Sequence, residues 1–182
     1  PETETLVDAI LNENLQGKTL LELGTGSGAI SISIAQENKD CFIFATDISI
    51  KSILVAKQNA AKFYCENIIF LNHDWNNEWL FPQVDYLISN PPYVDKEATT
   101  GKEEGIWHEP EKALVSKDKG LSDLKLILSK GKNFLNENGK VYLEHAPDQY
   151  EELNKFAMEN GYLNFSNLND LNGDKRVSIY QC

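Results

Sequence analysis

The segment Asn90-Pro91-Pro92-Tyr93 directly follows an apolar run that is long enough for a buried strand. The Asn90 amide can both donate and accept hydrogen bonds. Pro91 has no N–H, but its carbonyl oxygen accepts, and proline restricts the chain around it. Tyr93 adds a flat aromatic face. We interpret the segment as a holder for a planar NH2 group, whose two donors match the two fixed acceptors. The alternative is a proline-bearing turn in which Asn90 satisfies a backbone group.

A glycine-rich segment, "LLELGTGSGAI", runs from a strand-like pattern through Gly24, Gly26 and Gly28 into a helical pattern. Such glycines allow a sharp turn and a close approach of the backbone to a ligand, and the helix N-terminus offers free N–H groups. Asp47 ends the next apolar run, where an acidic side chain can accept both ribose hydroxyls of an adenosine ligand. It could equally serve the start of the next helix, which Ser49 could cap. The segment resembles motif I of S-adenosylmethionine-dependent methyltransferases more than the G-x-G-x-x-G of dinucleotide enzymes.

Asp74 and Trp75, in "NHDWNNEW", follow the third strand-like run. They could bind the amino group and the face of an adenine, although Trp75 could instead be a packing residue at the strand end. The predicted cofactor-binding residues are Gly24, Thr25, Gly26, Ser27, Gly28, Asp47, Asp74, Trp75 and Asn90.

Together these residues predict methyl transfer to a poorly nucleophilic NH2 nitrogen. Holding both hydrogens directs the nitrogen's electron density along the line of attack. A sulfonium donor leaves as a neutral thioether, and the methylated nitrogen becomes acidic, so neither an acid nor a strong base is required. The acceptors stabilise the developing positive charge. We predict Asn90, Pro91 and Tyr93 as catalytic and Asn90, Pro91, Pro92 and Tyr93 as substrate-binding, with S-adenosylmethionine as cofactor and no metal.

The elements that position these residues alternate along the chain. The predicted strands are Thr19–Leu23, Cys41–Thr46, Ile68–Asn72, Val84–Ser89, Val141–His145, Tyr162–Phe165 and Val177–Tyr180. The predicted helices are an opening segment around Leu6, then Gly28–Glu37, Ser49–Cys65, a segment from Leu121 to Leu135, and Asp148–Asn160. The alternation predicts βαβ units in a Rossmann-like α/β fold with helices on both faces. "NLNDLNGDK" leaves no room for a crossover helix, so the last of seven strands should be antiparallel.

Composition restricts the partners. The chain has 182 residues and a net charge of −11, with Arg176 as its single arginine, which disfavours stable nucleic-acid binding. Its three cysteines lie far apart, and His73, His108 and His145 show no metal-ligand spacing. It carries no membrane-length apolar run or signal peptide, and it starts with Pro1 rather than methionine. We expect a monomeric, reduced, cytoplasmic protein.

The whole chain resembles the release factor glutamine methyltransferases. The motifs "PETETLVD", "LLELGTGSGAISISIA", "FATDIS", "HDW", "LISNPPYV", "EPEKALVS", "GLSDL", "GKVYLEHA" and "NGDKRVSIY" follow in family order. The resemblance implies a class I methyltransferase fold, a release factor as protein substrate, the glutamine of its GGQ motif as acceptor, and S-adenosylhomocysteine as product. It also implies that residues 1–182 form a single catalytic domain, without the helical N-terminal domain of the family, and that the loop from Val94 to Asp118 helps receive the partner.

Other functions remain open from the sequence. The same NPPY chemistry serves methyltransferases of amino groups in RNA or DNA bases, and a ribosomal-protein glutamine is another acceptor. The residues after Tyr93 complete the sheet and leave no target-recognition domain for a nucleic acid. A non-catalytic adenosine-binding module and a dehydrogenase fit less well, because the glycine and NPPY motifs are both intact and the sequence shows no hydride-site residue.

Overall fold

A seven-stranded mixed sheet organises the part of the chain that the structure describes. The computed structural model describes residues 2–91, 94–95, 115–116 and 121–182. Within these ranges seven strands pair in the order β3-β2-β1-β4-β7-β9-β8. Their bounds are β1 Thr19–Leu23, β2 Phe42–Asp47, β3 Ile68–Asn72, β4 Val84–Ser89, β7 Leu135–Glu144, β8 Asn164–Asn169 and β9 Lys175–Gln181. The predictions for Pro92, Tyr93 and His108 lie outside the described residues, as does most of the loop from Val94 to Asp118.

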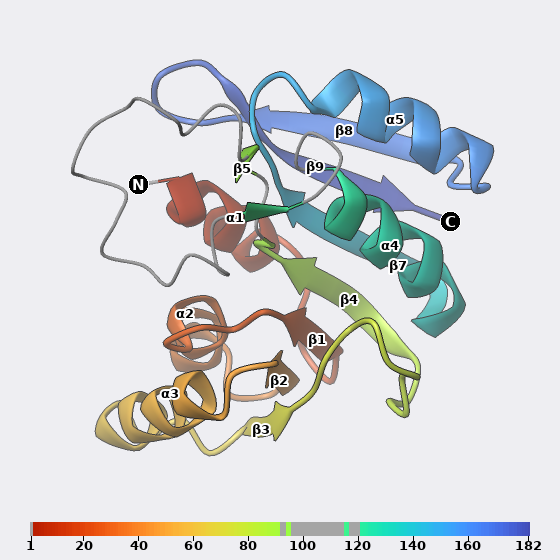
Figure 1. The fold of residues 1–182 in the computed structure, drawn as a ribbon. Helices are drawn as coiled ribbons and strands as arrows, with labels where there is room; N and C mark the ends of the chain where they lie inside the picture. Colours follow the sequence, from red (N-terminus) through yellow and green to blue (C-terminus); the bar gives the residue numbers. More distant parts are fainter. Residues whose placement is uncertain (1, 92–93, 96–114, 117–120) are drawn as a thin grey trace.

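The strand directions confirm the predicted topology. The pairs β1–β2, β1–β4, β2–β3 and β4–β7 are parallel, whereas β9 is antiparallel to both β7 and β8. The last strand therefore enters the sheet between β7 and β8, as Figure 1 shows. A short turn at Gly173, with φ 89°, joins β8 to β9, and no crossover helix lies between them.

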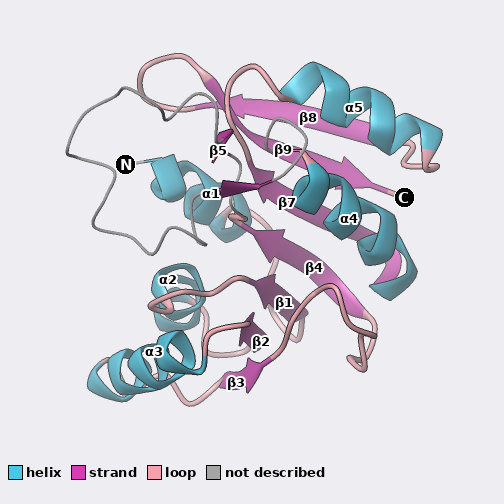
Figure 2. Ribbon diagram, viewed as in Figure 1, coloured by secondary structure: helices cyan, strands magenta, loops and turns pink. Residues whose placement is uncertain are grey.

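Five α-helices in the described ranges cover the two faces of the sheet (Figure 2). On one face lie α1 (Glu2–Leu11), α2 (Ala29–Glu37) and α3 (Ile50–Lys62); on the other lie α4 (Ser122–Gly131) and α5 (Tyr150–Glu159). Alternate strand residues serve the two layers, because successive side chains point to opposite faces. Leu20 packs with Leu6 and Ile34, whereas its neighbour Leu21 packs with the cluster of α4 and α5. None of these helices is long and apolar enough to cross a membrane.

Some element boundaries differ from the prediction. β7 begins at Leu135, well before the apolar run at Val141, and its pairing with β4 shifts register between Val84 and Tyr86. β8 begins at Asn164, two residues after the predicted start at Tyr162. Tyr162 is instead buried before the strand, and its hydroxyl donates to the Leu128 carbonyl at 2.9 Å. Two-residue strands β5 (Val94–Asp95) and β6 (Val115–Ser116) also pair in parallel. Elements this short leave no periodicity in the sequence.

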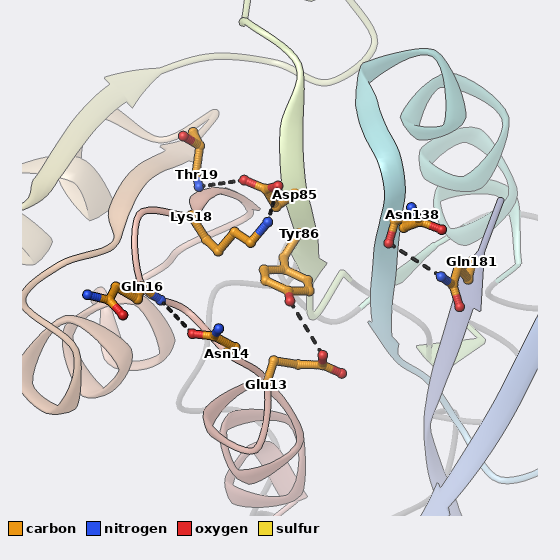
Figure 3. A network of polar contacts seen from close by, with 9 residues as sticks. All are labelled: Glu13, Asn14, Gln16, Lys18, Thr19, Asp85, Tyr86, Asn138 and Gln181. Carbon is orange, nitrogen blue, oxygen red and sulfur yellow. Dashed lines mark hydrogen bonds and ion pairs between the residues drawn. The ribbon is translucent and has the colours of Figure 1, made fainter.

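A polar network fixes the edge of the sheet where the parallel strands begin (Figure 3). Asp85, at the start of β4, accepts from Lys18 Nζ at 3.0 Å and from the Thr19 backbone N–H at 2.9 Å. Glu13, just after α1, accepts from Lys140 Nζ and from the Tyr142 hydroxyl, both at 2.6 Å. Burial alone would raise the pKa of Glu13, but these hydrogen bonds outweigh it and lower the pKa. The network ties α1 and the start of β1 to β4 and β7.

Candidate functional site

The turn from β1 to α2 has the conformation that its glycines permit. Gly24, Gly26 and Gly28 have φ values of 77°, 56° and 86°, in the left-handed region that favours glycine. The backbone N–H groups of Gly24 and Thr25 donate to the Thr46 carbonyl oxygen at 2.9 and 2.8 Å. The turn is therefore tied to the end of β2, and Gly28 starts α2 as its N-cap.

A side chain at each of these three glycines would meet different surroundings. A Cβ at Gly24 would lie 3.1 Å from Trp75 Cζ3. A Cβ at Gly28 would lie 2.9 Å from Ile32 Cδ1 and 3.1 Å from Ala56 Cβ, so this glycine lets α2 and α3 approach each other. At Gly26 an added Cβ would meet nothing within 4 Å. Of the three, Gly26 is the one that borders open space, where a ligand could reach the backbone.

Asp47 connects the glycine turn to α3. Its Oδ2 accepts from the Gly26 backbone N–H at 2.9 Å, and its Oδ1 accepts from the Ser49 backbone N–H at 2.7 Å. Ser49 caps α3, its Oγ accepting from the Ser52 backbone N–H at 3.3 Å. Both uses of Asp47 considered from the sequence are therefore compatible. Each carboxylate oxygen keeps a second lone pair that a ribose hydroxyl could use.

Glu22 is a residue that the sequence-based assignment left without a role. Its side chain is 1% exposed, and Oε2 accepts from Thr25 Oγ1 at 2.7 Å and from Ser31 Oγ. Burial raises the pKa of this carboxyl above its ordinary value. Within the described part of the chain, Oε1 is buried and has no hydrogen-bond partner. Glu22 thus holds the glycine turn through Thr25 and Ser31; its place two residues before Gly24 was the signal in the sequence.

The turn after β3 carries Asp74 and Trp75. Asp74 Oδ1 accepts from the Asn76 backbone N–H at 2.9 Å and from its side-chain amide at 2.8 Å, and these bonds lower the pKa of Asp74. The half-buried indole of Trp75 lies beside Gly24, and its Nε1 donates to Asp123 Oδ1 at 3.4 Å. Trp75 also packs against the core of the α4–α5 face, so its packing role and its place beside the glycine turn coexist.

Asn90 and Pro91 follow β4, beside the end of β1 where the glycine turn begins. Leu23 and Ser89 are register partners, and Ser89 Oγ donates to the Leu23 carbonyl at 2.7 Å. Asn90 is half-buried, and its Nδ2 donates to Thr3 Oγ1 at 3.4 Å, whereas Pro91 is buried. The contact of Thr3 with Asn90 was not predicted from the sequence, although Thr3 lies in the motif "PETETLVD". Because Nδ2 has a protein partner, Oδ1 is the Asn90 atom left for a substrate amide.

Both described histidines make contacts within the fold. His145 is fully buried; its Nδ1 lies 2.8 Å from the Ala146 carbonyl oxygen and its Nε2 lies 2.7 Å from Ser178 Oγ. Burial lowers the pKa values of His145 and His73. His73 meets Phe81 edge-on, with ring centroids 4.9 Å apart. Among the described residues, no cluster of three or more His, Cys, Asp or Glu side chains could hold a metal ion.

The geometry therefore gathers most of the predicted residues at one edge of the sheet. The carboxyl ends of β1, β2, β3 and β4 carry the glycine turn, Asp47, Asp74–Trp75 and Asn90–Pro91 respectively, and this is the edge where α/β folds bind ligands. Thr25 is buried under the turn, and Ser27 is exposed, its carbonyl accepting from Asn59 Nδ2 at 3.0 Å. The arrangement can hold an adenosine ligand beside a planar amide.

The chain is similar to known methyltransferases. Residues 1–117 match the family described as methyltransferase small domain. The chain is 34% identical over 183 residues to the release factor glutamine methyltransferase of Aliivibrio fischeri, covering 100% of this chain and 64% of the relative. It is 33% identical over 180 residues to the enzyme of the same name from Escherichia coli, covering 98% and 65%. The chain thus spans slightly less than two thirds of the length of these relatives.

Solved structures share the fold. A SAM-dependent O-methyltransferase of Thermotoga maritima superposes with a TM-score of 0.73 at 14% identity, over 98% of this chain and 64% of that chain. At this identity the likeness shows the fold alone. It confirms the predicted Rossmann-like class I methyltransferase arrangement, with its antiparallel last strand.

Proposed function

Because the chain belongs to the methyltransferase small domain family, we propose that it transfers a methyl group from S-adenosylmethionine to a glutamine side-chain amide, that of the GGQ motif of peptide chain release factors. The observation that carries this proposal is the contact between the ends of β1 and β4. The Ser89 hydroxyl donates to the Leu23 carbonyl at 2.7 Å, so the glycine turn and Asn90–Pro91 are held side by side. The names of the similar relatives support the choice of acceptor.

The residues present fit the cofactor. Gly26 borders open space, and Asp47 is hydrogen-bonded to the backbone N–H of Gly26. The buried Glu22 Oε1 is an acceptor without a partner among the described residues. Gly24 to Gly28 would hold the methionine part, Asp47 the ribose, and Asp74 with Trp75 the adenine. When bound, S-adenosylmethionine supplies an electrophilic methyl group on a sulfonium that becomes a neutral thioether.

The protein's own residues act by binding and orienting the acceptor. Asn90 Oδ1 and the Pro91 carbonyl oxygen accept the two N–H groups of the substrate amide, which fixes the plane of that amide. The fixed plane directs the nitrogen's electron density toward the methyl donor, and the same two acceptors stabilise positive charge as it develops on the nitrogen. The methylated nitrogen then loses its proton readily, so no strong base is needed.

Pro91 and Thr3 support this arrangement. Proline restricts the backbone on both sides of its own position, so the Pro91 carbonyl has little freedom to turn away. Thr3 Oγ1 accepts from Asn90 Nδ2 and thereby favours the amide orientation in which Oδ1 serves the substrate. Pro92 and Tyr93 lie outside the described residues, and we assign them to the same amide holder from the sequence alone.

Mass spectrometry tests the proposal. Unmodified bacterial release factor is incubated with the protein and trideuteromethyl-labelled S-adenosylmethionine, and the GGQ peptide is fragmented. We expect one labelled methyl group on the glutamine side chain, and none on a matched release factor in which that glutamine is replaced by glutamate. Absence of label, although the protein binds the cofactor, would overturn the proposed acceptor. Ribosomal proteins and RNA would then be assayed under the same conditions.

A further inference from the structure

Lys130, in the last turn of α4, makes an unusual set of contacts. Its Nζ lies 2.9 Å from each of three consecutive carbonyl oxygens, those of Trp75, Asn76 and Asn77. A lysine ammonium group has three N–H donors, and here each has its own acceptor. The half-buried side chain thus joins α4 to the turn that follows β3.

That turn belongs to the connection from β3 to β4, residues 73–83, which contains no helix or strand. Two backbone hydrogen bonds hold its first part, from the Asn77 N–H to the Asp74 carbonyl at 2.9 Å and from the His73 N–H to the Asp47 carbonyl at 3.0 Å. Side-chain contacts add to them. Trp79 Nε1 donates to the Trp75 carbonyl at 2.8 Å, and Asp74 binds Asn76 as described above. Lys130 adds hydrogen bonds to three consecutive carbonyls of the turn, and it does so from a separate element, α4.

The same helix also reaches the Trp75 ring. Asp123, in the first turn of α4, accepts from Trp75 Nε1 at 3.4 Å. Asp123 and Lys130 are seven residues apart, two helical turns, and so lie on one face of α4. The helix therefore holds Trp75 both by its indole nitrogen and by its main chain, while the ring lies against Gly24.

We propose that Lys130 is a positioning residue for the cofactor: by fixing the carbonyls of residues 75–77, it holds the Trp75 indole beside the glycine turn in the orientation that adenine binding requires. The inference rests on the proposed function, in which Trp75 flanks the adenine. Preorganised contacts of this kind lower the cost of ordering a site when the ligand binds. Without Lys130 the indole samples other orientations, and the cofactor must bear the cost of ordering it.

Lys132 provides a matched control two residues further along the chain. Its Nζ donates to the carbonyls of Asn160 and Gly161 at 3.0 and 2.8 Å, closing the end of α5. This is also a lysine-to-carbonyl clamp, but it does not touch the turn after β3 or the glycine turn. Lys130→Met and Lys132→Met remove similar bonds and keep an apolar stem at each position.

The experiment compares the affinity of wild type, Lys130→Met and Lys132→Met for S-adenosylhomocysteine by isothermal titration calorimetry. Thermal unfolding and amide hydrogen exchange are measured on the ligand-free proteins. We expect both variants to fold with similar small losses of Tm. Lys130→Met should bind about tenfold more weakly, as expected for the loss of charged hydrogen bonds that preorganise a site. Exchange should accelerate at residues 75–78 in this variant alone, and Lys132→Met should bind like wild type.

Three results would overturn the inference, and they differ. Equal affinity of wild type and Lys130→Met would show that the clamp does not serve the cofactor, while leaving the proposed function intact. Equal losses of affinity in both variants would show that the weaker binding follows from lower stability of the fold and not from the turn after β3. Failure of wild type itself to bind S-adenosylhomocysteine would refute the proposed function and the inference with it.

Discussion

Replacing Gly28 by alanine should destabilise the fold through a defined collision. Gly28 has φ 86°, and an L-residue in this region costs about 1–2 kcal/mol. The new Cβ would also lie 2.9 Å from Ile32 Cδ1, 3.1 Å from Ala56 Cβ and 3.3 Å from Ala56 Cα. The flexible end of Ile32 can rotate away, but the Cα and Cβ of Ala56 are fixed by the backbone of α3. The resulting overpacking should add about 1–3 kcal/mol to the loss of stability. We expect a total loss of roughly 2–5 kcal/mol in the free energy of unfolding.

Gly17→Ala isolates the collision. Gly17 has φ 70°, and an added Cβ there meets nothing within 4 Å. Both alanines also restrict the unfolded chain to the same extent, so that contribution cancels in the difference. Urea denaturation of both variants should show Gly28→Ala less stable than Gly17→Ala by about 1–3 kcal/mol. Equal stabilities would refute the claim that Gly28 is needed for the packing of α2 against α3.

Three further predictions concern the site and the titrating groups. Gly26→Ala should match Gly17→Ala in stability but bind S-adenosylhomocysteine at least about tenfold more weakly, because its methyl group enters the open space of the turn; unchanged affinity by calorimetry would contradict this. Glu13 has a lowered pKa, so its stabilisation is present above its ordinary value of 4.5 and is lost as pH falls through the folded pKa. Wild type should therefore exceed Glu13→Gln by about 1 kcal/mol in the free energy of unfolding from urea denaturation at pH about 7, and this difference should narrow as the pH falls below 4.5. His145 also has a lowered pKa, so wild type should lose stability as pH falls below 6.5 toward the folded pKa, whereas a folded His145→Gln variant should not show this slope; parallel pH profiles would argue against a buried neutral imidazole.

Much of the fold could be predicted because buried strands of a parallel sheet are continuous apolar runs. The buried strands β1 and β4 have the predicted bounds, Thr19–Leu23 and Val84–Ser89. The edge strand β3 also has its predicted bounds, Ile68–Asn72, because its apolar run is continuous, although Phe70 alone in it is buried. β8 was harder, since most of its residues are exposed and four of the six are polar. The two-residue strands β5 and β6 are defined by their pairing with each other, which no local pattern records.

In the candidate site, too, some residues could be predicted from the sequence and others could not. Asp47 could be predicted from its position at a strand end after the glycine turn, and the structure places it one hydrogen bond from Gly26. The contacts of Thr3 with Asn90 and of Lys130 with residues 75–77 join segments far apart in the chain. Neither a threonine at a helix start nor a lysine on an amphipathic helix is distinctive by type. Only the assembled fold reveals what these side chains touch.

The most direct test of the account is the rate of methyl transfer by an Asn90→Ala variant in a single turnover, with release factor and labelled S-adenosylmethionine. Loss of one of two acceptors that stabilise developing charge should lower the rate about 100-fold or more. Thermal unfolding, and transfer measured at S-adenosylmethionine concentrations raised until the rate no longer increases, separate this effect from any loss of folding or of cofactor affinity. Transfer by Asn90→Ala at the wild-type rate would contradict the claim that the end of β4 holds the glutamine amide.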